Sequence, residues 1–171
     1  MCVKFIKYRC ETHHVILEEY KRNTLEPLEL LLKGQFDNIA LWFDEDMFCQ
    51  INYLTILAYL EQINFTGEIK LNLVNYNFEV IASHDLNAKG YLQIFKQVMI
   101  DKSMPRDITL SALEKGIKLY LEYLKEDNVI TEYIKKHKDL TRDMLVRELL
   151  KSFPEYGLGD TQYFELIDGY R

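Results

Sequence analysis

The chain has 171 residues and a net charge of −6 at pH 7, and its composition is 48% hydrophobic and 28% charged. This balance is typical of a globular protein with a buried core, which excludes a disordered chain, a collagen-like repeat and a disulfide-stabilised miniprotein. The presence of only 7 Gly and 3 Pro argues against an all-β barrel or sandwich, because such folds need many tight turns.

The charge, the cysteines and the first residues indicate the compartment and the partners. A net negative charge argues against nucleic acid as a partner, because phosphate binding depends on Lys and Arg, although it leaves room for a local basic face. Three cysteines, Cys2, Cys10 and Cys49, form no secretory framework. Residues 1–7 contain two lysines with no apolar segment after them, and the longest apolar runs are far shorter than a membrane span. We therefore expect a cytoplasmic protein that makes no contact with a membrane.

The first elements are predicted from short patterns. Residues 3–8 alternate between apolar and charged side chains, which predicts a strand, and residues 12–33 have the three- and four-residue apolar spacing of helices. Thr24 followed by Pro27 indicates that a second helix begins there, since Pro is tolerated in the first helical turn. Gly34 is expected to end that helix.

The clearest pattern lies in residues 38–74. Residues 38–43 predict a continuous apolar strand, residues 44–46 an acidic loop, and residues 47–61 a helix with so little polar surface that it must be buried. Residues 68–74 alternate as a second strand, so the segment is a predicted βαβ unit with a parallel pair of strands. Residues 78–82 are a candidate third strand.

Helices dominate the rest of the chain. They are predicted at residues 88–99, 111–125, 129–137, 142–152 and 161–168. Four capping signals accompany these helices, namely a capping box from Ser111 to Glu114, Asp127, Thr141, and Asp160 or Thr161 for the last helix. The predicted fold class is therefore α/β, with a small, mostly parallel sheet that contains the βαβ unit, followed by an all-helical C-terminal half. We place an α/β domain at residues 1–104 and a helical region at residues 105–171.

The acidic loop is the strongest candidate for a ligand site. Asp44, Glu45 and Asp46 follow a strand at the carboxyl end of the predicted parallel pair, where open α/β folds bind ligands. Carboxylates there can bind Mg²⁺ or act as acid and base, and equally one of them can cap the following helix. Gln50 and Asn52 interrupt the apolar helix, and their amides either reach a ligand or bond to backbone or water. We predict a ligand site at Asp44, Asp46, Gln50 and Asn52.

Other reactive side chains have ordinary explanations. Metal-binding side chains gather near the N-terminus at Cys2, Cys10, His13 and His14, but a lone Cys-x-x-His is common by chance and no metal is predicted. Cys49 lies in the apolar helix, where a core position is favoured over a nucleophile activated by His84. The chain has no phosphate-binding or dinucleotide-binding glycine loop and no zinc-protease or serine-hydrolase signature, so no cofactor is identified and catalysis is left open.

One stretch of the C-terminal half is basic and contains Lys135, Lys136, Lys138, Arg142, Arg147 and Lys151. Residues 142–152 and 161–168 could be arranged as a helix-turn-helix, but the second helix has two acids and no Lys or Arg, and only Gln162 could contact a base. A solvated helix face is the better interpretation. The glycine-containing loop at 157–159 could bind an anion at the start of the last helix, but Asp160 favours a structural turn.

Residues 41–52, Leu-Trp-Phe-Asp-Glu-Asp-Met-Phe-Cys-Gln-Ile-Asn, resemble the core motif of an uncharacterised bacterial family, the domain of unknown function with the serial number one-eight-three-five. In that family a Leu-Trp-Phe strand leads to an acidic residue, a Phe, a Gln and a buried Leu-rich helix. Residues 156–162 resemble the Gly-Leu segment near the C-termini of its members. The resemblance covers residues 12–168 and is strong at residues 38–62. Members are sometimes labelled AraC-type transcriptional regulators, and the family implies no established reaction.

The chain departs from this family at its start. It lacks the usual opening strand and the acidic, Gly-Pro-containing loop that follows that strand. A site shared between that loop and Asp44 or Asp46 is therefore expected to be incomplete here.

Three functional hypotheses follow. The leading one is a bacterial, cytoplasmic binding or regulatory module whose small-molecule ligand lies near Asp44, Asp46 and Gln50. The first alternative is an enzyme whose carboxylates hold a divalent ion for chemistry on a phosphorylated or nucleotide-like substrate. The second is a transcription factor that uses residues 141–171. The aromatic content is also compatible with a homodimer.

Overall fold

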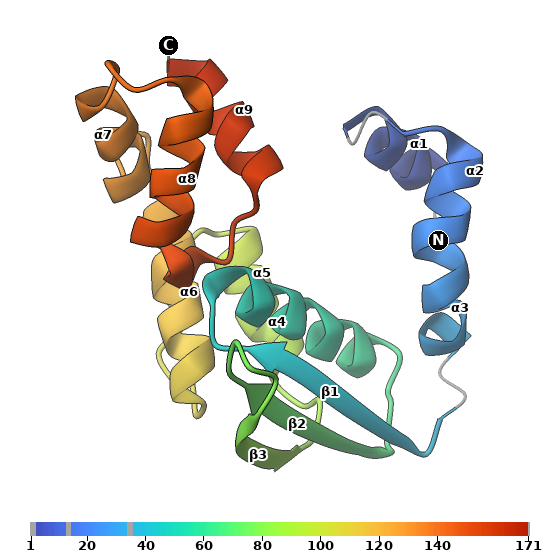
Figure 1. Cartoon of the computed structure of the whole chain (residues 1–171). Coiled ribbons are helices and arrows are strands. Elements are labelled where there is room, and N and C mark those ends of the chain that lie inside the picture. The colour runs from blue at the N-terminus through green and yellow to red at the C-terminus, as the bar shows by residue number, and fades with distance from the viewer. Residues whose placement is uncertain (1–2, 13–14, 34–35, 171) are drawn as a thin grey trace. The chain divides into compact units, whose positions relative to one another are not determined.

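A computed structural model describes residues 3–12, 15–33 and 36–170 (Figure 1). The chain divides into two compact units, Met1–Asp37 and Asn38–Arg171. The first unit begins with α1 (Val3–Thr12), so the strand predicted at residues 3–8 is wrong. A lone strand leaves its backbone N–H and C=O groups without partners, whereas a helix satisfies them within itself.

The rest of the first unit is a continuous helical segment. A π-helical turn, Lys21–Leu25, joins α2 (Leu17–Tyr20) to α3 (Glu26–Lys33), so the predicted helix start at Thr24 is wrong. The N–H of Glu26 donates to the carbonyl oxygen five residues back, at Lys21. Pro27 has no N–H, and its ring crowds the carbonyl four residues before it, so a wider turn ahead of the proline relieves the conflict. The helix end predicted at Gly34 lies outside the described residues.

The second unit is built on a three-stranded mixed sheet with the order β1-β2-β3. β1 (Asn38–Asp44) and β2 (Glu68–Val74) are parallel and are joined by α4 (Met47–Gln62), which confirms the predicted βαβ unit and the α/β class. β3 (Val80–Leu86) pairs antiparallel with β2 and confirms a third strand, which begins later than predicted.

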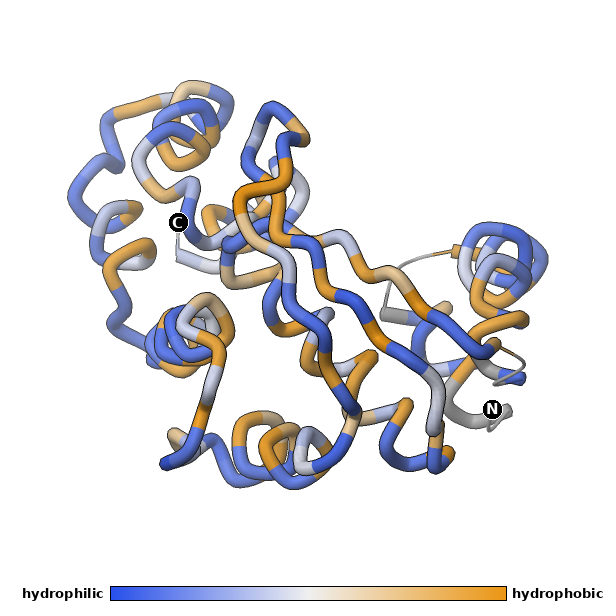
Figure 2. The backbone as a smooth tube through the Cα atoms, turned by 90° about the horizontal axis from the view of Figure 1, so that it is seen from below, coloured by the Kyte–Doolittle hydropathy of each residue, from blue (hydrophilic) through white to orange (hydrophobic). Residues whose placement is uncertain are grey.

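The two faces of the sheet have different surroundings. Leu41 of β1 lies opposite Leu71 of β2, and both are buried on the face where α4 packs against β1. On the other face Trp42 lies opposite Asn72. Seen from this second side, the strands lie in front of the helices of the same unit (Figure 2). Within residues 38–170, that face of the sheet therefore has no helix across it.

α4 is the centre of the second unit. It packs against β1, α5 (Tyr91–Met99) and α6 (Ser111–Tyr123), which explains why it is apolar on nearly every side. α6 crosses α4 at Gly116, where a Cβ atom would lie 2.5 Å from the Cβ of Gln50. The two helices therefore approach more closely than a larger residue permits.

The predicted C-terminal helices form a bundle around a second buried cluster. α7 (Val129–Lys136), α8 (Arg142–Ser152) and α9 (Asp160–Tyr170) enclose it, and Met47 from the start of α4 extends into it. The other fully buried members of the cluster are Ile130, Ile134, Leu145, Leu149, Tyr163 and Ile167. No helix in the described ranges combines the length and the apolarity that crossing a bilayer requires. The boundary placed between residues 104 and 105 stays a prediction.

Two of the predicted caps differ in detail, and α9 already includes Asp160 as its first residue. α6 begins at Ser111, but Leu110 is its N-cap residue and no side chain caps it, because Ser111 lies one position too far along for a capping box. Asn128, and not Asp127, caps α7, through a capping box with Thr131. The Thr141 cap of α8 is confirmed by the N–H of Met144, which donates to the Thr141 hydroxyl.

The start of α5 is capped by a side chain of α4. α5 begins later than predicted, after Gly90, which has a φ of +93°. The carboxylate of Glu61, at the end of α4, accepts hydrogen bonds from the N–H groups of Gly90 (2.8 Å) and Leu92 (2.6 Å). The Glu61 carboxylate thus caps α5, although β2 and β3 lie between α4 and α5 in the sequence.

We expect Gly116→Ala to lower the free energy of unfolding by about 1–3 kcal/mol, because the added methyl group overlaps the stem of Gln50 and forces α4 and α6 apart. The matched control is Gly169→Ala in α9, where nothing lies within 4 Å of the added Cβ. That variant should be neutral or stabilised by up to about 1 kcal/mol, as helix propensity requires. Urea denaturation measures both, and equal effects would contradict the close crossing.

Candidate functional site

The acidic loop between β1 and α4 is held by its own hydrogen bonds. The Asp46 carboxylate accepts from the N–H of Cys49 at 2.7 Å and caps α4, and the Asp44 carboxylate accepts from the N–H of Glu45. Gln50 reaches back to the same loop, where its Nε2 donates to the backbone oxygen of Asp44 at 2.7 Å. Asp44, Asp46 and Gln50 are therefore brought together. Asn52 is exposed on α4, because residues two apart on a helix point in different directions.

Gly157, from the C-terminal part of the chain, packs against this loop. It follows a 3₁₀ turn, Pro154–Tyr156, and has a φ of +63°, which favours glycine. A Cβ atom at this position would overlap the Asp46 carboxylate. The two sequence segments that carry the family resemblance thus meet in space, with the glycine packed against the cap of α4.

The buried amide of Gln50 is only half satisfied. Gln50 is 0% exposed, and its Oε1 is the buried side-chain atom for which no described residue supplies a hydrogen bond. Rotating the amide would not help, because the oxygen would then face the carbonyl oxygen of Asp44. A buried acceptor without a donor costs about 1–3 kcal/mol. Gln50 Oε1 is therefore set up to receive a hydrogen bond from a guest molecule or from water.

A cavity of about 130 Å³ adjoins Gln50. Its apolar wall is the helix-covered side of β2, with Leu71 and Leu73, and His84 of β3 lies beside them. The opposite wall is the start of α6 with the residues before it, from Thr109 to Ala112. Because no side chain caps this helix, the N–H groups of its first turn are free to donate, and the helix dipole adds positive potential.

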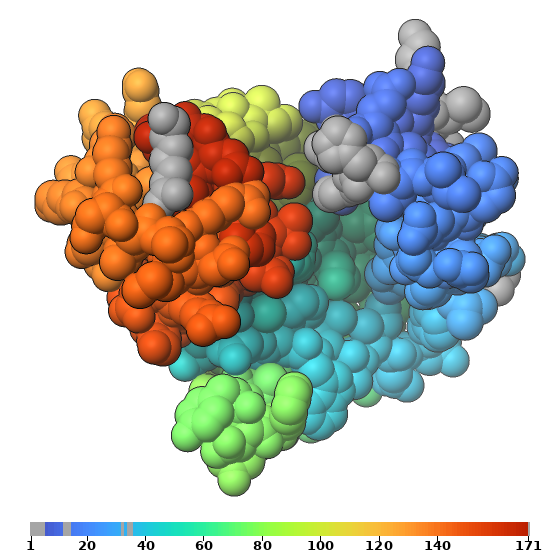
Figure 3. All heavy atoms as spheres, turned by 45° about the horizontal axis from the view of Figure 1, so that its top comes forward, coloured from blue at the N-terminus to red at the C-terminus, as the bar shows by residue number. Residues whose placement is uncertain are grey.

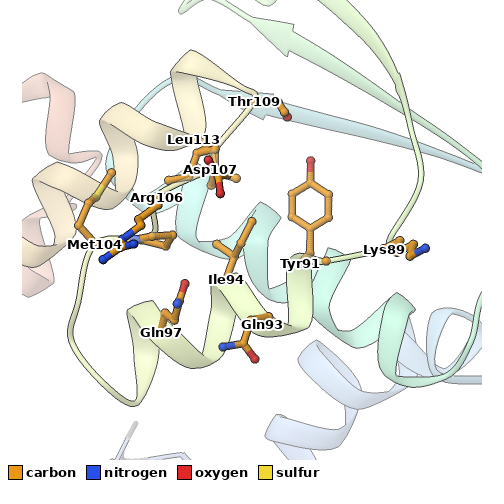
Figure 4. A pocket seen from close by; sticks show the side chains of 13 residues that line it. Lys89, Tyr91, Gln93, Ile94, Gln97, Met104, Arg106, Asp107, Thr109 and Leu113 are labelled. Atoms are coloured by element: carbon orange, nitrogen blue, oxygen red, sulfur yellow. The ribbon is translucent and has the colours of Figure 1, made fainter.

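A larger groove lies on the other side of the segment before α6. It has a volume of about 720 Å³ and runs between α5 and residues 104–109 (Figure 4). Ile94 points from α5 into this groove. Arg106, from the segment before α6, and Gln97, from α5, also line the groove (Figure 4). Thr109 lines both the groove and the smaller cavity, so the two spaces adjoin at this residue.

The cysteines and histidines do not gather into a metal centre in the described part of the chain, where no three His, Cys, Asp or Glu side chains come together. Cys10 and Cys49 are free thiols. Cys2, His13 and His14, the other members of the N-terminal cluster, lie outside the described residues. Burial raises the pKa of the Cys49 thiol to about 11, and the nearby carboxylates add to that effect. The thiol is therefore protonated at neutral pH, which disfavours a nucleophilic role.

The basic stretch of the C-terminal half is largely ion-paired. Lys135 pairs with Asp127, and Arg142 makes a bidentate bond to Asp168 while it lies 3.9 Å from the ring centroid of Phe164. Lys136 and Lys151 pair with glutamates on their own helices. Gln162 accepts from the N–H of Gly159 at 3.0 Å, so it caps the start of α9. These contacts agree with a solvated helix face.

Sequence reasoning found Gln50 but missed most of the groups around it. His84 lies on β3, whereas Thr109 and Ser111 belong to the start of α6 and the residue pair before it, and no spacing in the sequence connects these two segments with Gln50. Two signals were present: a glycine within a helical pattern at position 116, which indicates close backbone approach, and the irregular segment at residues 101–110, since long connections are often functional.

Comparisons with protein-family models, with curated proteins and with solved structures return no match. The resemblance carried by residues 41–52 and 156–162 therefore stays a hypothesis.

We expect Asp46→Ala to lower the free energy of unfolding by about 1 kcal/mol, because the N–H of Cys49 loses its acceptor. Asp46→Asn should retain most of that stability, since Asn is an equally good N-cap residue. Urea denaturation of the two variants separates a capping role from a role of the charge. An Asn variant as unstable as the Ala variant would contradict capping.

Cys49 should react slowly with iodoacetamide at pH 8. With a pKa of about 11, its thiolate fraction is on the order of a hundredfold below that of an ordinary cysteine. Peptide mass spectrometry follows the rate, which should rise about tenfold per pH unit up to pH 10. The urea-unfolded chain is the control, and equal rates in the folded and unfolded chains would contradict the raised pKa.

Proposed function

We propose that the protein is a binding module for a small polar ligand, whose head group occupies the cavity beside Gln50. The single observation that carries this proposal is the buried, unpartnered Oε1 of Gln50. Native structures contain few such atoms, and each needs an explanation by a bound molecule or by ordered water. This proposal follows the hypothesis of a ligand near Asp44, Asp46 and Gln50, and it moves the ligand to the helical side of the sheet.

The groups around the cavity define the chemistry of the ligand. Gln50 Oε1 needs a donor, and the N–H groups at the start of α6 need an acceptor. A head group that carries both within a few atoms meets this requirement, as a primary carboxamide does. Acceptor-only groups such as a carboxylate fit the helix but not Gln50. Leu71 and Leu73 supply apolar contact for the adjoining carbon atoms.

The alternatives have weaker support. For the transcription factor, the side chains that would contact DNA are engaged within the protein, Arg142 with Asp168 and Gln162 with Gly159. For the metal-dependent enzyme, Asp46 already caps α4, and no third metal-binding side chain adjoins Asp44 and Asp46 among the described residues. The binding module uses a polar group that the fold otherwise leaves unsatisfied.

Binding of acetamide and of acetate tests the proposed chemistry of the ligand. The backbone amide NMR shifts of Ser111 and Ala112 measure the binding of each probe. We expect acetamide to shift these resonances in a saturable way and acetate to shift them far less, because acetate has no donor for Gln50 Oε1. Gln50→Met should abolish the acetamide response. Gln93→Met, on the wall of the larger groove, is the matched control and should leave it unchanged. Equal responses to both probes, or a response that survives in Gln50→Met, would overturn the proposal in favour of ordered water.

A further inference from the structure

A group of exposed apolar side chains lies on and beside the uncovered face of the sheet. Trp42 on β1 is 58% exposed, and Tyr76 and Phe78 at the tip of the β2–β3 hairpin are 84% and 86% exposed. Val80 and Ile81 at the start of β3 continue this group, which we call the aromatic surface. In the space-filling view the hairpin tip stands out beyond β1 (Figure 3). Trp42 is separated from the apolar residues of β3 by Asn72 and Ser83, whose side chains are hydrogen-bonded to each other. Large apolar side chains exposed in this number at one end of a sheet are typical of an interaction site.

The hairpin tip is built to hold its aromatic side chains outward. The side-chain oxygen of Asn75 accepts from the N–H groups of Asn77 (2.9 Å) and Glu79 (3.0 Å), and its amide nitrogen donates to the Glu79 carboxylate. Phe78 has a φ of +62°, which is uncommon for a bulky residue. A loop that maintains this conformation presents its rings without an ordering cost on binding.

The charges around the aromatic surface have one sign. Asp44 is the last residue of β1 and Glu45 follows it, and Glu79 lies within the hairpin tip. In the sheet and its connecting hairpin, residues 38–44 and 68–86, Lys70 is the sole Lys or Arg, and it pairs with Ala40, further from the tip than Trp42. The exposed apolar side chains of this surface therefore have carboxylates as their charged neighbours near the hairpin tip.

We propose that the aromatic surface binds an amphipathic helix of a partner protein, with apolar residues on one side and Lys or Arg along its flanks. A parallel pair of strands is ordinarily covered on both faces, and a helix is the element that usually covers it. Basic flanks complement Asp44, Glu45 and Glu79. A second copy of the chain fits less well, because a two-fold contact through this surface sets carboxylates against carboxylates. The proposal is independent of the cavity beside Gln50.

Trp42 makes the proposal directly testable, because it is the single tryptophan of the chain. The probe is a synthetic helical peptide with Leu on one face and Lys on the other. Its controls are a scrambled peptide of the same composition and a peptide with Glu in place of Lys. We expect the Leu/Lys helix to shift Trp42 emission to shorter wavelength, with an affinity that falls as salt rises, and the two control peptides to bind far more weakly.

Two matched pairs of variants assign the binding to the aromatic surface. Phe78→Asn removes the ring while Asn tolerates the positive φ, and it should weaken peptide binding about tenfold. Ile100→Ser changes another exposed apolar residue, directly after α5, and should not weaken it. Glu45→Lys should weaken binding and flatten its salt dependence. Asp139→Lys, which reverses an equally charged, exposed residue between α7 and α8, should change neither.

Several outcomes would overturn the proposal. Trp42 emission that is already typical of a buried ring in the protein alone would show that another part of this chain covers the surface. A shift that grows with protein concentration, together with a dimer in sedimentation, would identify a second copy as the occupant. Equal binding of the Leu/Lys helix and the Leu/Glu helix would show that the carboxylates do not select the partner. Equal effects of Phe78→Asn and Ile100→Ser would show that binding does not take place at the aromatic surface.

Discussion

The close crossing of α4 and α6 at Gly116 is the constraint on which the rest of the second unit depends. The absent side chain at this position lets the stem of Gln50 lie directly against the α6 backbone. That contact directs the Gln50 amide toward the end of β1, where it bonds to Asp44, and it sets the start of α6 beside the sheet. The cavity lies between Gln50 at this crossing, the helix-covered side of the sheet and the start of α6.

The first turn of α4 joins the sheet to the C-terminal bundle. Asp46 caps the helix, Met47 enters the buried cluster of the bundle, and Gly157 packs against the Asp46 carboxylate. These three contacts lie within two residues of the acidic loop, so a change in the bundle is transmitted to the loop through packed atoms and not through a flexible linker. The geometry thus connects the cavity beside Gln50 to the C-terminal bundle through directly packed residues.

The sequence alone was sufficient for the elements with strong periodicity and insufficient for the contacts between them. The βαβ unit was predictable because residues 38–74 combine a continuous apolar strand, an apolar helix and an alternating strand. The strand predicted at residues 3–8 failed because a six-residue pattern carries no information about a neighbouring strand. At the site, Gln50 was identifiable as a polar residue on a buried helix, but His84 and Thr109 approach it only through tertiary packing. The competing interpretation of Asp46 as a cap was also available from its position before the helix.

The connectivity of the mixed sheet orders its assembly. The β2–β3 hairpin closes over a few residues, whereas β1 can pair with β2 only after the whole of α4 has been placed between them. Closing the shorter loop costs less chain entropy, so the hairpin is expected to form before the parallel pair. During that interval the inner edge of β2 is bare, and the neighbouring Glu68 and Lys70 interrupt its apolar residues with charge. The alternation that places Leu71 and Leu73 in the core thus also puts charged side chains along the edge of β2 at which β1 pairs.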